Sequence, residues 1–196
     1  MLSEQALADF QSEVASQGRM ALMSFEEMLL ARIHPGEQKI NMLKFWKAVQ
    51  SILVFSGNVS KLFWPPDAKY KARGVQLRAS LGVEDDNVLN DRKLRNCFEH
   101  FDEHLQKWLM AHEGKGVVDH CIASRKVLTS IKPEIYRRLF EPDTYSVTFM
   151  GEQFPLRPIE EALLKIVERA EALVEEYHKN WHLTARSTKQ QAAPTR

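Results

Sequence analysis

The sequence is poor in cysteine and contains no long hydrophobic run. Two cysteines among 196 residues, Cys97 and Cys121, are too few for a disulfide framework, which a chain of this length does not need to build a core. The longest apolar cluster, around residues 52–55, is far shorter than the roughly 20 residues of a membrane-spanning helix. The N-terminus leads into an acidic amphipathic stretch, which is not the pattern of a secretory signal. We therefore expect a cytoplasmic protein with reduced thiols and no membrane partner.

An excess of charge of one sign is also missing, because the formal net charge is +1. Glycine-rich phosphate-binding loops and Walker-type motifs are absent, which argues against nucleotide hydrolysis. Hydrophobic residues make up 44% and charged residues 27%, as in ordinary folded domains. The length fits one domain over residues 1–182. Residues 183–196 are rich in Ser, Thr, Gln, Ala and Pro and predict a disordered tail.

Apolar residues recur at helical spacing over most of the chain. This period predicts helices over residues 3–33, 37–63, 68–81, 91–112 and 159–181, and a short helix near 122–131. Pro35-Gly36, the Trp64-Pro65-Pro66 string and Gly82 are the expected helix ends, and Gly18 is a point at which the first helix could divide.

Residues 135–157 have a different pattern. Tyr145, Val147 and Phe149 alternate with polar residues, and Phe154 and Leu156 follow Gly151-Glu152, as in a small β-hairpin or meander. Glycine tolerates the positive φ of a tight turn, so Gly151 is expected at or beside the turn. The predicted fold class is therefore all-α: a helical bundle with a small β-hairpin insertion before the C-terminal helix.

The segment 92–109 has the clearest amphipathic pattern in the chain. Its apolar stripe comprises Leu94, Cys97, Phe98, Phe101, Leu105, Trp108 and Leu109. On a continuous helix Arg92, Asn96, Glu99, His100 and Glu103 project from the opposite side, with Arg95 on the flank. We expect Trp46, Phe98, Phe101, Leu105, Trp108 and Leu163 to be largely buried, because each lies on an apolar stripe.

The string Arg95-Asn96-Cys97-Phe98-Glu99-His100 resembles the motif of HEPN domains, in which arginine and a polar residue precede histidine. The resemblance implies a helical domain that forms a homodimer and cleaves RNA without a metal or other cofactor, as in toxin or phage-defence systems. It implies that Arg95, Asn96 and His100 are catalytic. Arg92, Glu99 and Glu103 flank them and are expected to contact the substrate. Residues 94–108 and 147–152 are also similar to a family of uncharacterised bacterial proteins.

The residue types suit RNA cleavage by the internal 2′-hydroxyl. Histidine can act as acid and base near neutral pH, and arginine offers a charged fork to phosphate oxygens. Asparagine can orient a hydroxyl group or the imidazole. On one continuous helix Arg95 and His100 would lie about 140° apart, so two helices packed around a two-fold axis would aim them at one phosphate more easily.

Several alternatives remain open. A helical protein of the same fold without catalysis could bind a partner or a nucleotide through this polar face. His100 and His104 are four residues apart and could bind a metal with His120 or Cys121 as a third ligand. Cys121 beside His120 could also be a thiol nucleophile. Residues 39–78 are rich in lysine and arginine, and could form a basic surface for RNA phosphates.

Overall fold

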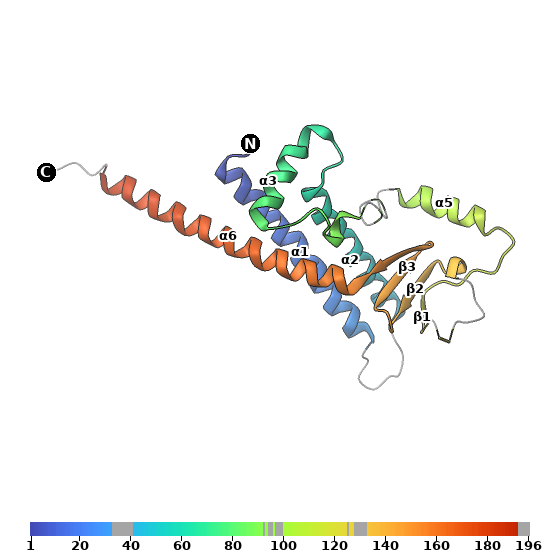
Figure 1. Ribbon diagram of the computed structural model, residues 1–196. Coiled ribbons are helices and arrows are strands. Elements are labelled where there is room, and N and C mark those ends of the chain that lie inside the picture. The colour runs from blue at the N-terminus through green and yellow to red at the C-terminus, as the bar shows by residue number, and fades with distance from the viewer. Residues whose placement is uncertain are drawn as a thin grey trace.

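The computed structural model describes residues 1–32, 41–91, 93, 96, 100–124, 126–127 and 133–191. The described chain is mainly helical, with one small sheet before the last helix (Figure 1). The helices are α1 (Glu4–Arg32), α2 (Met42–Phe63), α3 (Lys71–Leu81), α5 (Phe101–Ala111) and α6 (Leu156–Gln191), and short 3-10 turns cover Ala68–Tyr70, Val88–Asn90 and Pro133–Ile135. None of the helices in the described ranges combines the length and apolarity needed to cross a membrane.

Local signals set several of the helix ends. The Asn41 side chain accepts a hydrogen bond from the Lys44 amide, 3.0 Å away, and so caps α2. Trp64 ends α2 before two prolines, as the sequence predicted. Gly82 ends α3 in the left-handed conformation, with φ of 66°. The predicted end of the first helix at Pro35-Gly36 lies outside the described residues.

The helix α1 continues through Gly18, so the helix does not divide at the point where the sequence allowed a division. Gly18 is buried, and a Cβ atom placed on it would lie 2.4 Å from Cγ2 of Val167. The glycine therefore permits α1 and α6 to approach closely, which outweighs its low helix propensity. Figure 1 shows α1, α2 and α6 packed beside one another, and the C-terminal half of α6 extending beyond the other helices.

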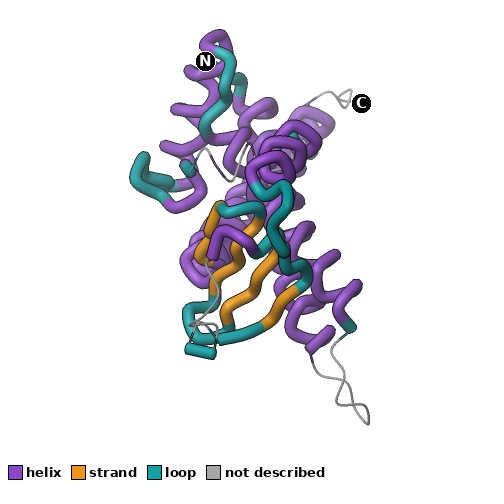
Figure 2. The backbone as a smooth tube through the Cα atoms, turned by 90° about the vertical axis from the view of Figure 1, so that its right-hand side faces the viewer, coloured by secondary structure: helices purple, strands orange, loops and turns teal. Residues whose placement is uncertain are grey.

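The sheet has the order β1-β2-β3-β4 (Figure 2). Three of its strands, β2 (Arg138–Glu141), β3 (Ser146–Phe149) and β4 (Glu152–Pro155), form the predicted antiparallel meander. Met150 and Gly151 connect β3 to β4 with φ of 48° and 85°, the positive values that a two-residue type I′ turn requires. The β-structure and the turn position of Gly151 are therefore confirmed.

Two expectations near the sheet are wrong. A short helix is expected near 122–131, but the structure has no helix at the described residues there. Cys121–Ile122 form the strand β1, which pairs in parallel with β2, and residues 126–127 form a turn. The last helix begins at Leu156, not after Pro158. Proline is tolerated there because the amides of the first helical turn have no partner within the helix. The helix also runs beyond residue 181 to Gln191, and residues 192–196 lie outside the described chain.

The main core lies between α1, α2, α6 and one face of the sheet. Its largest buried side chains include Phe25, Phe45, Phe63, Phe140 and Phe154. Trp46, Trp108 and Leu163 are buried as predicted. Phe101 and Leu105 are half-buried, which is less than predicted, and Phe98 lies outside the described residues.

Candidate functional site

The segment that resembles the HEPN motif is only partly described. Asn96 is helical and exposed, and His100 is exposed but not helical. His100 has φ of −121° and ψ of 43°, and α5 begins at the next residue, Phe101. The continuous helix predicted over 91–112 is therefore wrong. Arg92, Arg95 and Glu99 lie outside the described residues.

The interruption at His100 changes the geometry expected of the motif. Apolar residues on both sides of His100 keep one helical register in the sequence, so their period does not reveal the interruption at His100. The angle of about 140° between Arg95 and His100 holds only for an unbroken helix. Since the helix is interrupted, this angle no longer argues against a joint role for the two side chains.

His100 has a carboxylate beside it. Its Nδ1 atom lies 3.6 Å from Oε1 of Glu103, and both side chains are 59% exposed. The other carboxylate oxygen of Glu103 lies 3.9 Å from Nζ of Lys107. Glu103 can therefore orient the imidazole of His100, while both groups remain open to a substrate from solvent.

A small pocket of about 160 Å³ lies between this segment and the turn from β3 to β4. Its described lining residues are Lys93, Asn96, His104, Phe149, Met150, Glu152 and Phe154, and His100 is not among them. Lys93 forms an ion pair with Glu152 at 2.5 Å. The hydrogen bond and the charge of Glu152 raise the pKa of the Lys93 ammonium. Asn96 and His100 thus lie on the same segment but do not share this pocket.

The remaining alternatives from the sequence gain little from the geometry. Over the described ranges, no three or more His, Cys, Asp or Glu side chains are grouped so that they could hold a metal ion. Burial raises the pKa of the Cys121 thiol, which disfavours the thiolate that a nucleophile requires. In the basic stretch, Lys47 pairs with Glu27 at 2.6 Å and Arg78 pairs with Asp85 at 3.1 Å. These pairs reduce the positive charge available to RNA.

A second cluster of charged residues, which the sequence did not predict, lies where β1 and β2 begin. Asp119 accepts two hydrogen bonds from Arg138, each 2.7 Å long, and lies 3.5 Å from Nη1 of Arg137. His120 follows Asp119 with φ of 54°, in the left-handed region, and its ring contacts Trp46 edge to face at 5.9 Å. Two arginines around one carboxylate leave the cluster with an excess of positive charge.

The surroundings lower the pKa of both titratable groups of this cluster. Burial, followed by the charge of Arg138, lowers the pKa of His120. Burial alone would raise the pKa of Asp119, but the hydrogen bonds and charge of Arg138 outweigh it, so the pKa is lowered. His120 is therefore mainly neutral at neutral pH, and Asp119 is ionised.

These shifts predict that acidification destabilises the protein. The unfolded chain protonates His120 near its ordinary pKa of about 6.5, while the folded chain does so only at lower pH, so the free energy of unfolding falls as pH drops below about 6.5. Asp119 adds to this loss at still lower pH, as it becomes protonated. Urea unfolding between pH 7.5 and 5 should show a smaller fall in the free energy of unfolding for His120→Asn than for wild type. Asparagine is chosen because it tolerates the positive φ at this position. Equal falls in wild type and variant would contradict the prediction.

Comparison of the chain with models of protein families, with curated proteins and with solved structures finds no match.

Proposed function

We propose that the protein is a metal-independent endoribonuclease of HEPN type, a helical-bundle enzyme that acts as a homodimer. The observation that carries this proposal is the Arg95-Asn96-x-x-x-His100 string, whose histidine is exposed beside Glu103 at the start of α5. A solvent-accessible imidazole next to a carboxylate is suited to proton transfer at neutral pH.

The proposed reaction uses the RNA chain as its own nucleophile. The 2′-hydroxyl attacks the adjacent phosphorus, so that the P–O2′ bond forms and the P–O5′ bond breaks. An imidazole accepts the proton of the 2′-hydroxyl, and an imidazolium gives a proton to the leaving 5′-oxygen. His100 from the two copies of the chain supplies these two roles. Arg95 neutralises the charge that develops on the phosphate oxygens, and Asn96 orients the hydroxyl group.

The surface of α5 supports a role for a second copy of the chain. Leu109 and Met110 are 47% and 68% exposed near the C-terminal end of this short helix. Exposed apolar side chains of this size are common at protein interfaces. A dimer in which the two copies of α5 pack side by side and run parallel would bring the two His100 side chains toward each other, because His100 directly precedes the helix.

The test is an RNA cleavage assay with the purified full chain. We expect cleavage of single-stranded RNA, or of RNA loops, because the backbone there can reach an in-line geometry. The products should carry 2′,3′-cyclic phosphate ends, and addition of EDTA should leave the rate unchanged. A pool of diverse RNA that stays intact, together with a monomeric protein, would refute the proposal in favour of a non-catalytic binding protein.

A further inference from the structure

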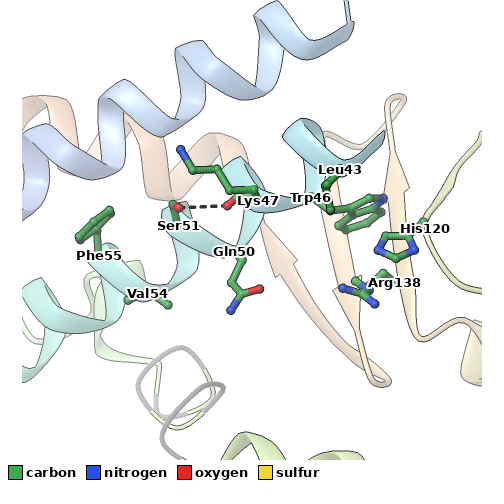
Figure 3. Close-up of a pocket in the computed structure, with 9 residues that line it drawn as sticks. All are labelled: Leu43, Trp46, Lys47, Gln50, Ser51, Val54, Phe55, His120 and Arg138. Atoms are coloured by element: carbon green, nitrogen blue, oxygen red, sulfur yellow. Dashed lines mark hydrogen bonds between the residues drawn. The ribbon is translucent and has the colours of Figure 1, made fainter. Parts of the chain in front are cut away.

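A pocket beside the charged cluster lies between α2 and the start of β2 (Figure 3). Its volume is about 370 Å³, within the range of pockets that bind small molecules. The lining residues are Leu43, Trp46, Lys47, Gln50, Ser51, Val54, Phe55, His120 and Arg138. None of these residues lines the small pocket at Asn96, so the two are separate places on the described surface.

One side of this pocket is suited to an anion. Arg138 has an 18% exposed side chain, and its hydrogen bonds to Asp119 use Nε and one terminal nitrogen. The other terminal nitrogen, Nη1, retains its N–H groups for a ligand. No aspartate or glutamate is among the described lining residues, because Asp119 lies behind Arg138 and is held by the two arginines. A carboxylate or phosphate would therefore meet positive charge here without facing an acid.

The other side of the pocket is suited to a planar apolar group. Leu43, Val54 and Phe55 line it from α2, together with the indole of Trp46. Figure 3 shows Trp46 next to His120 and Arg138, and Gln50 extending from α2 between this group and Phe55. Lys47 also lines the pocket, and its ammonium is paired with Glu27 at 2.6 Å. The amide of Gln50 can hydrogen-bond to polar atoms at the edge of a ring.

We propose that this pocket binds a small organic acid with a planar ring, with the acid group on Arg138 and His120 and the ring against the apolar side chains that line the pocket from α2. Nucleotides and aromatic carboxylates both have this chemistry. The proposal does not depend on ribonuclease activity, because it concerns different residues. Its consequence is that binding requires both parts of the ligand, since the charged side and the apolar side each contribute.

Calorimetric titration of the full chain with four probes tests this. Adenosine 5′-monophosphate and indole-3-acetate each combine a ring with an acid, whereas adenosine lacks the acid and inorganic phosphate lacks the ring. We expect at least one of the first two to bind, and its affinity to exceed that of the two incomplete probes at least tenfold. A preference for the nucleotide or for the carboxylate identifies the class of acid. Failure of both complete probes to bind, or equal binding of adenosine and its monophosphate, would overturn the proposal.

Variants then locate the binding. Gln50 is exposed on α2, so Gln50→Glu should fold and should weaken binding of the acid at least tenfold by placing a negative charge in the pocket. Gln5→Glu, the same change at an exposed position of α1, is the matched control and should bind as wild type does. His100→Ala should also retain binding, which separates this pocket from the proposed ribonuclease site. In NMR titrations the bound acid should raise the pKa of His120. Unchanged affinity in Gln50→Glu would place the ligand elsewhere.

Discussion

Replacing His100 with alanine is expected to abolish RNA cleavage and to leave the stability of the protein nearly unchanged. An imidazole that transfers protons typically contributes about 10²- to 10⁴-fold to a rate, so cleavage should fall by at least that factor. The side chain is 59% exposed and caps α5 with no side-chain hydrogen bond, so its loss removes little packing. Initial rates on a labelled RNA, together with urea unfolding of the same samples, measure both effects.

The matched control for this change is His178→Ala. His178 is exposed on α6, and its ring contacts Tyr177 at 5.7 Å, so the same truncation there should leave cleavage unchanged. The Arg95→Lys variant should cleave RNA much more slowly than wild type, because an ammonium lacks the bidentate fork of a guanidinium. If His100→Ala and His178→Ala cleaved RNA at the wild-type rate, the role assigned to His100 would be wrong.

Replacing Phe140 with alanine is expected to lower the free energy of unfolding by about 3–5 kcal/mol, the usual cost of removing a large aromatic side chain from a core. Phe140 is fully buried, and its ring lies 5.3 Å from Phe45 and 6.0 Å from Tyr145. The guanidinium of Arg32 lies 5.4 Å from the ring centre. One side chain therefore joins β2 to α1, α2 and the loop before β3. Urea unfolding at pH 7 measures the change.

Leu164→Ala on α6 is the control for this truncation. Leu164 is 51% exposed, so its loss should change the free energy of unfolding by no more than about 0.5 kcal/mol. Arg138 lies two residues before Phe140 on the same face of β2. The Phe140 variant should therefore also weaken ligand binding in the pocket at His120. If Phe140→Ala lowered the free energy of unfolding by less than 1 kcal/mol, the packing of this side chain would not be what stabilises the sheet against the helices.

The parts of the fold that follow from local signals could be predicted from the sequence. The two prolines after Trp64 and the left-handed Gly82 mark helix ends through the conformations that these residues allow. The hairpin at Gly151 has both an alternating pattern and a turn residue. By contrast, β1 has only two residues, too few for an alternating pattern, and exists through its pairing with β2.

The candidate sites were harder to predict, for different physical reasons. The motif at Asn96 and His100 was visible because its residues are close in sequence, but the helix break at His100 leaves no trace in the apolar period. The pocket at Arg138 joins Trp46, His120 and β2, which only the folded chain brings together. The one available signal was Arg138 itself, a charged residue directly before the apolar Leu139 and Phe140.

The contact between α1 and α6 has a consequence for the order in which the protein is completed during translation. Arg19 pairs with Glu171, 152 residues later, and Gly18 packs against Val167. The ribosome releases α1 well before α6, so the side of α1 that packs against α6 stays exposed to solvent while the residues between them are synthesised. Closing so long a loop is slow compared with forming local helix contacts. The nascent chain therefore presents an uncovered apolar flank, available to chaperones, until α6 has emerged.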